Sequence, residues 1–176
     1  KSSKPVALIA VALIFALWIY SFFYVPTFDL DESLYRRVAE EMKWNKDYWH
    51  PKWDGWALNH KPPIYYWLIS IFSLLIDGAN EGVSIFSARL PSFFATIGII
   101  LAIGASRKNI LTALLLWGCT LFPLATSTSV LFDPLQTLSL LPCLLIPHRA
   151  FSEQRGISKK EYLIIALSMF GASALK

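Results

Sequence analysis

Cysteine, charged residues and repeats are all scarce in this 176-residue chain. Its two cysteines, Cys119 and Cys143, lie inside apolar runs, which argues against a disulfide or metal role and favours two small buried residues. No internal repeat or low-complexity segment is visible. Charged residues make up 16% of the chain, and the basic ones form no single patch, so the net charge of +4 does not indicate a nucleic-acid partner.

Apolar residues are abundant instead, at 55% of the chain against roughly 45–50% in soluble domains. The first long apolar run, residues 5–26, can cross about 30 Å of hydrocarbon. It follows Lys1 and Lys4 and ends in aromatic residues without a small-residue cleavage site, so it predicts a spanning helix and not a signal peptide. The composition predicts an all-α, polytopic integral membrane protein.

The apolar run 63–76 decides the topology, because about 14 residues are too few to span a bilayer. If it nevertheless spans, Arg107 and the basic stretch 148–160 face outward. If it lies in the interface, both face the cytoplasm together with the N-terminus, as the excess of positive charge in cytoplasmic loops requires. The second arrangement is favoured. About five spanning segments are then expected, at residues 5–26, 86–105, 110–125, 130–146 and 162–175.

Residues 28–83 then form a large first extracytoplasmic loop, with the N-terminus in the cytoplasm. Within this loop, Ser33 to Trp44 has apolar residues at helical spacing and predicts a helix lying on the membrane surface. The last apolar run is short and closes on Lys176, and the chain starts on Lys1, so we expect the N-terminal portion of a longer protein.

Ionisable residues at the outer end of the predicted spans are the candidates for chemistry, because such residues at membrane depth are costly. Each also has a structural explanation. The carboxylates of Asp31, Glu32 and Asp133 can stabilise helix N-termini. Lys61 can anchor the chain at the interface, and Lys176 can snorkel toward it.

Lys61 precedes two prolines, which hold it extended and suit it to contact a phosphate. His60 beside it could ligate a metal, although no second ligand is suitably spaced. The loop also carries four tryptophans, which suit either an interfacial belt or stacking on sugars. They are Trp44, Trp49, Trp53 and Trp56.

Several short motifs occur in a fixed order along the whole chain. This series resembles the polyprenyl-phosphate-dependent GT-C glycosyltransferases, the superfamily that includes lipid A aminoarabinose transferases and protein O-mannosyltransferases. The motifs are Asp31-Glu32-x-x-Tyr35, Ala39-Glu40-Glu41-Met42, Lys61-Pro62-Pro63-x-x-x-Trp67, Ala88-Arg89-Leu90-Pro91-Ser92, Leu131-Phe132-Asp133-Pro134 and Ala174-Leu175-Lys176.

The resemblance implies that residues 1–176 are the N-terminal part of a transmembrane catalytic domain performing an inverting sugar transfer. It implies a polyprenyl-phosphate sugar as donor and a lipid, glycan or protein as acceptor. It also implies a bacterial inner membrane as the location, with the functional site on the periplasmic side. Asp31, with Glu32 beside it, corresponds to the catalytic position, acting as general base on the acceptor hydroxyl. Lys61 and Lys176 correspond to donor-phosphate contacts. Supporting positions are Tyr35, His60, Arg89 and Asp133.

Two departures from the aminoarabinose transferases leave the donor and a possible divalent metal open. His60 stands where those enzymes have Glu, and Leu34 replaces their Arg three residues after the Asp. The alternative function is a transporter or other non-enzymatic membrane protein. A transporter places polar groups near the bilayer midplane, whereas here they gather at one face, which favours the enzyme. The sequence does not specify the sugar or the acceptor.

Overall fold

The computed structural model describes residues 4–26, 30–58, 61–107, 110–111, 113–114 and 128–175. Helices make up most of these residues, and the sheet within them is a single two-stranded hairpin. The predicted all-α class is therefore confirmed.

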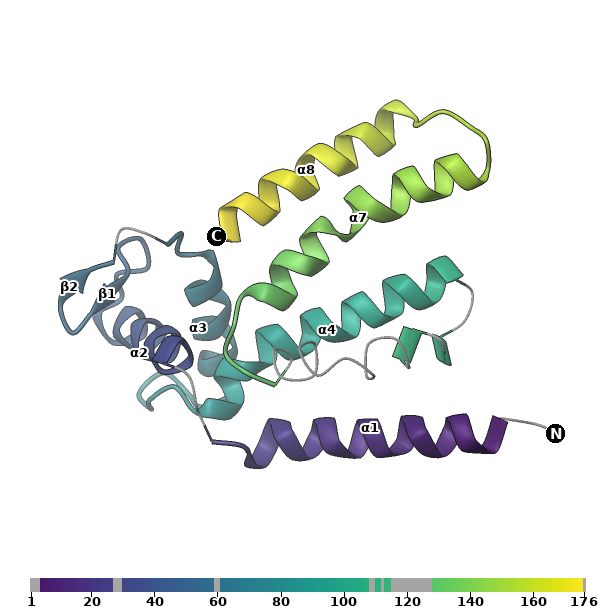
Figure 1. Ribbon diagram of the computed structural model, residues 1–176. Coiled ribbons are helices and arrows are strands. Elements are labelled where there is room, and N and C mark those ends of the chain that lie inside the picture. Colours follow the sequence, from purple (N-terminus) through teal and green to yellow (C-terminus); the bar gives the residue numbers. More distant parts are fainter. Residues whose placement is uncertain are drawn as a thin grey trace.

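Four long helices extend in the same general direction (Figure 1). Two pairs pack closely, α4 with α7 and α7 with α8. Helix α1 packs against α4 through aromatic rings, since Trp18 stacks on Phe93 with 4.7 Å between ring centroids. The four are α1 (Lys4–Tyr24), α4 (Ile85–Arg107), α7 (Asp133–Ser152) and α8 (Lys159–Leu175).

A compact group of short elements covers one end of these helices, as Figure 1 shows. Its helices α2 (Leu30–Asn45) and α3 (Ile64–Ile76) pack on each other, and α3 also packs on α4. Helix α2 has apolar residues on one face only, so it buries that face against α3. The main apolar core of the described residues lies here, and includes Tyr35, Val38, Met42, Tyr66 and Ile69.

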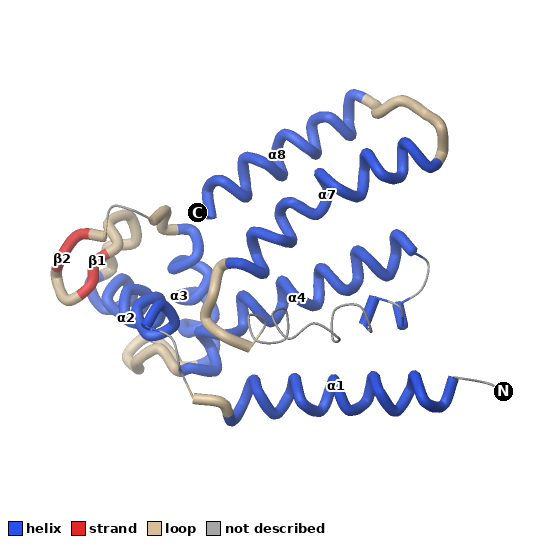
Figure 2. Tube along the Cα trace, viewed as in Figure 1, coloured by secondary structure: helices blue, strands red, loops and turns tan. Residues whose placement is uncertain are grey.

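The hairpin, β1 (Lys52–Trp53) and β2 (Trp56–Ala57), lies beside α2 and was not predicted (Figure 2). Its turn residues Asp54 and Gly55 both have positive φ, 48° and 82°, as a type I′ turn requires. Glu41 on α2 holds this turn by accepting hydrogen bonds from both backbone N–H groups, at 2.6 and 3.4 Å. The Asp-Gly pair between tryptophans was the available sequence signal.

The predicted start and end of α7 were both wrong. Helix α7 begins at Asp133 and not at Val130, because Val130 and Leu131 use their backbone groups in hydrogen bonds to Glu32 and Ser92. It then continues through Pro142 and Pro147 to Ser152, past the predicted end of the span at residue 146.

Helix α8 also begins earlier than predicted, at Lys159. A capping box starts it: Ser158 N–H donates to Glu161, and Glu161 N–H donates back to the Ser158 hydroxyl.

The apolar helices differ in length. Within the described residues, one helix, residues 85–106, is long and apolar enough to cross a membrane, judged by length and composition. The apolar helices over residues 9–24 and 64–76 are shorter. The 63–76 prediction, a helix too short to span, therefore agrees with α3. Most of the predicted span 110–125 lies outside the described residues.

Candidate functional site

A buried ion pair organises the end of the molecule where α1, α4 and α7 meet α2. Arg89 Nε on α4 donates to Glu32 Oε1 in the first turn of α2, at 3.0 Å. Their side chains are 2% and 3% exposed. Two charges withdrawn from water in this way are stable only with close pairing and further hydrogen bonds. Both residues were predicted as site residues. In the structure this ion pair, together with the backbone groups that it binds, forms a buried framework beneath the site.

The same pair binds two more segments. Arg89 Nη1 donates to the Phe22 carbonyl at 2.9 Å, near the C-terminus of α1, where a positive charge is favourable. Glu32 Oε1 also accepts the Val130 N–H at 3.2 Å. One ion pair thus ties together α1, α2, α4 and the segment before α7, which come from distant parts of the sequence.

Ser92, one turn after Arg89, fixes the approach to α7. Its hydroxyl donates to the Leu131 carbonyl at 2.6 Å and lies 3.1 Å from the Tyr65 hydroxyl on α3. Because a serine hydroxyl has one hydrogen, already used for Leu131, Tyr65 is the donor in this second bond. Phe132 is therefore held beside Tyr65 of α3, with 6.5 Å between ring centroids.

Asp31 is oriented by the burial of its neighbour. Glu32 points into the framework, so Asp31, one residue earlier on the helix, points away from it and is 52% exposed. Tyr35 lies one turn further along the same face of α2. Lys61 Nζ is 3.9 Å from Asp31 Oδ2 and donates a hydrogen bond to the Tyr35 hydroxyl. The structure therefore brings the predicted residues Asp31, Tyr35 and Lys61 together.

The Lys61 ammonium is also surrounded by aromatic faces. It lies 4.5 Å from the centroid of the Tyr35 ring and 5.6 Å from that of Phe132, distances at which a cation is attracted to the ring. Its side chain is 23% exposed. A positive charge fixed beside an accessible carboxylate, in partly desolvated surroundings, is an arrangement that can stabilise an anionic leaving group while the carboxylate accepts a proton.

Tyr65 and Tyr66, which directly follow Lys61-Pro62-Pro63-Ile64, were missed by the sequence reasoning. Both rings pack on Tyr35, with centroid distances of 5.4 and 5.8 Å. Burial raises the pKa of each phenol well above its usual value, so both remain protonated at neutral pH. An aromatic pair directly after the Lys-Pro-Pro-Ile segment of the candidate phosphate-binding lysine was the signal available.

The remaining predicted site residues lie at the edge of this group or outside the described residues. Asp133 is the first residue of α7, half-buried and next to Phe132, which touches the site. His60 and Lys176 lie outside the described residues. Leu175, the last residue of α8, is buried at the end of that helix, and α8 makes contact with α3. The four loop tryptophans are at least half exposed, which suits both a membrane belt and sugar stacking.

Metal ligands are not grouped in the part of the chain that the structure describes: no three His, Cys, Asp or Glu side chains lie close enough there to hold an ion. Cys143 is a free thiol. The groups of the described site that can take part in chemistry include Asp31, Lys61 and the tyrosine hydroxyls.

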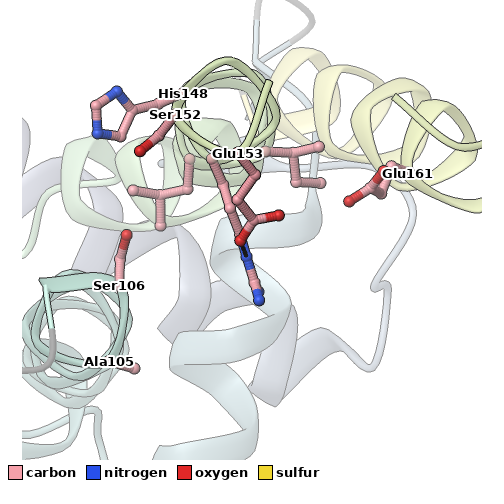
Figure 3. A pocket seen from close by; sticks show the side chains of 9 residues that line it. Ala105, Ser106, His148, Ser152, Glu153 and Glu161 are labelled. Carbon is pink, nitrogen blue, oxygen red and sulfur yellow. Dashed lines mark hydrogen bonds and ion pairs between the residues drawn. The ribbon is translucent and has the colours of Figure 1, made fainter. Parts of the chain in front are cut away.

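A separate cavity of about 660 Å³ lies between the C-terminal ends of α4 and α7 and the start of α8, and Figure 3 shows the side chains that line it. Ser106, His148 and Ser152 contribute polar groups to its lining. Its carboxylates are already paired with arginines, since Glu153 is 2.8 Å from Arg149, and Arg155 is 2.8 Å from Glu161. Hydrogen bonds from Arg155 lower the pKa of Glu161 to about 2. These charges serve the α7–α8 connection, and we assign no chemistry to the cavity.

Comparison with protein-family models, curated proteins and solved structures found no match to this chain.

Proposed function

We propose that this chain is part of a membrane glycosyltransferase that moves a sugar from a polyprenyl-phosphate donor to an acceptor on the extracytoplasmic face. The observation that carries the proposal is the grouping of Asp31, Tyr35 and Lys61 on a buried framework at the end of the long apolar helices. This grouping joins two motifs of the GT-C resemblance that lie 30 residues apart in the sequence.

A membrane environment is supported by the apolar surface that the helices leave uncovered. Helix α1 buries Trp18 and Phe22 but exposes most of its other large apolar side chains. Helix α3 buries serines against α2, where Ser70 and Ser73 form hydrogen bonds, and exposes its aliphatic face. Apolar surface of this extent fits contact with lipid or with further protein. The exposed residues include Leu13, Leu17, Leu74, Leu75, Leu163, Leu167 and Phe170.

In the proposed reaction, Asp31 removes the proton from the acceptor hydroxyl as its oxygen attacks the anomeric carbon of the donor sugar. The bond between that carbon and the phosphate oxygen breaks, and its electron pair leaves with the phosphate. Lys61 stabilises the resulting negative charge. A single displacement of this kind inverts the configuration at the anomeric carbon.

A transporter is the less favoured alternative. Transport sites form near the middle of the bilayer, on broken helices. In the described residues, Asp31 lies instead in the first turn of α2, with Lys61 beside it, at one end of the long helices. This position suits a reaction between a membrane-anchored donor and an acceptor that approaches from water.

The proposed topology predicts opposite accessibility for two exposed loop positions, Asn80 and Gly156. In a full-length protein with Cys119 and Cys143 replaced by Ser, Asn80→Cys should react with a membrane-impermeant maleimide in intact spheroplasts. Gly156→Cys should react only after lysis. Labelling of both positions in intact cells would contradict this topology.

The function is tested by comparing lipid A, glycans and envelope proteins of a deletion strain with wild type by mass spectrometry. We expect one sugar modification to be lost and to return with the wild-type gene. A Lys61→Met gene should fail to restore it, because the charge that stabilises the departing phosphate is gone. Lys52→Met is the matched control, since Lys52 pairs with Asp47 in the hairpin region at 3.2 Å. Unchanged envelope sugars in the deletion strain would contradict the proposal.

A further inference from the structure

The Tyr66 hydroxyl is the unexplained polar group of this site. The Tyr66 residue is fully buried, at 0% exposure. Its oxygen has no hydrogen-bond partner among the described residues. A buried phenol normally finds a partner, because leaving its hydroxyl unsatisfied costs free energy. Such a group in a native structure calls for an explanation, and one explanation is a bound ligand.

Its neighbour Tyr65 shows what a structural tyrosine looks like in the same place. The two residues are adjacent on α3 and pack on the same ring, that of Tyr35. Tyr65 donates to Ser92 and thereby joins the framework that holds the start of α7. Tyr66 makes no such bond, so its hydroxyl is not explained by the framework.

The surroundings of Tyr66 belong to the candidate site. The Tyr66 ring packs on the Tyr35 ring, with 5.8 Å between centroids, and the same Tyr35 ring lies 4.5 Å from the Lys61 ammonium. Burial raises the pKa of Tyr66, and the neighbouring Tyr35 and the Asp31 carboxylate raise it further. The phenol stays protonated and acts as a donor. The ligand atom that it meets must therefore be an acceptor, and the neighbouring Lys61 ammonium favours an acceptor that carries negative charge.

We propose that the Tyr66 hydroxyl donates a hydrogen bond to a phosphate oxygen of the lipid donor, beside Lys61. The inference rests on the proposed function and extends it, by adding a neutral donor from α3 to the cationic contact. A phosphate oxygen accepts several hydrogen bonds at once, so it can satisfy Tyr66 and Lys61 together. In this arrangement Tyr66 positions the leaving group, and Asp31 remains the base.

The test compares Tyr66→Phe with Tyr65→Phe in the full-length protein, purified in detergent. Affinities are measured for a polyprenyl monophosphate, for the corresponding polyprenol and for inorganic phosphate, together with the melting temperature without ligand. Tyr66→Phe should bind polyprenyl monophosphate about tenfold more weakly, the effect of one hydrogen bond to a charged group. Its affinity for polyprenol and its melting temperature should match or exceed those of wild type.

Tyr65→Phe should show the opposite pattern, with a lower melting temperature and nearly unchanged affinity for the phosphate. A loss for both phosphates assigns the contact to the phosphate itself, whereas a loss only for the lipid ties it to the lipid-bound position. A change below threefold for polyprenyl monophosphate overturns the inference. So does a drop in melting temperature as large as that of Tyr65→Phe, since the hydroxyl would then have an internal partner.

These results separate the inference from the proposed function. A wild-type protein that binds polyprenyl monophosphate through Tyr66 but transfers no sugar would overturn the glycosyltransferase proposal and leave the phosphate contact standing. Sugar transfer that continues with unchanged donor affinity in Tyr66→Phe would overturn the contact alone.

Discussion

Asp31→Asn should lower the turnover of sugar transfer by about 100- to 10,000-fold, the usual contribution of a general base. The amide has nearly the same shape as the carboxylate but cannot take the acceptor's proton. Donor binding should stay the same or tighten, because a negative charge 3.9 Å from the Lys61 ammonium is removed. Single-turnover transfer and equilibrium binding of the donor, measured on the full-length protein, separate the two effects.

Asp54→Asn is the matched control for this experiment. Asp54 lies in the same loop region, is 63% exposed, and pairs only loosely with Arg37 at 3.6 Å. Asparagine also tolerates the positive φ of this turn position. The control should keep full activity. Full activity in Asp31→Asn would remove Asp31 from the mechanism, and an equal loss of donor affinity would assign it to binding instead.

Arg89→Met should produce the largest loss of stability, about 3–5 kcal/mol in the free energy of unfolding, because it leaves the Glu32 carboxylate buried without a partner. It also removes the donor to the Phe22 carbonyl at the end of α1. Reversible unfolding in mixed detergent micelles, followed by circular dichroism, gives this quantity.

The double variant Glu32→Gln/Arg89→Met should recover part of the loss. The glutamine is neutral, and its carbonyl oxygen can still accept the Val130 N–H. Arg37→Met, at a side chain that is 46% exposed, is the surface control and should cost less than about 1 kcal/mol. If Arg89→Met is as stable as Arg37→Met, the ion pair is not what holds the four segments together.

Much of the local structure follows directly from the sequence. The period of apolar residues predicted α2, and the length of the run 63–76 predicted a short helix there. Long apolar runs predicted α1 and α4 closely. The formation of these helices depends on interactions between residues that are close in sequence, and a sequence pattern contains that information.

The boundaries of α7 and α8 could not be read in the same way. The span containing α7 was predicted to end at residue 146, yet the helix continues through Pro147 to Ser152. Its start is set by Glu32 and Ser92, which lie 98 and 39 residues away from their backbone partners. Local propensity contains no information about such distant partners.

The sequence likewise predicted one part of the candidate site, and tertiary structure decided the rest. Sequence alone identified Asp31, Glu32 and Lys61 as unusual, because charge beside long apolar runs is costly and needs a reason. Arg89 was named only through the motif resemblance. Asp31 and Glu32 were assigned one joint role. Tertiary structure separated them: Glu32 turns inward to Arg89, while the adjacent Asp31 turns outward to Lys61.

The sequence by itself thus determined which residues carry the charges and which short helices present them, since both depend on composition and period. Only tertiary structure decided which charges belong to the buried framework and which to the site. It also decided that, among the described residues, the buried hydroxyl of Tyr66 has no hydrogen-bond partner. The physical reason is that burial and pairing depend on segments brought together from α1, α2, α3, α4 and α7, and a sequence pattern does not record that assembly.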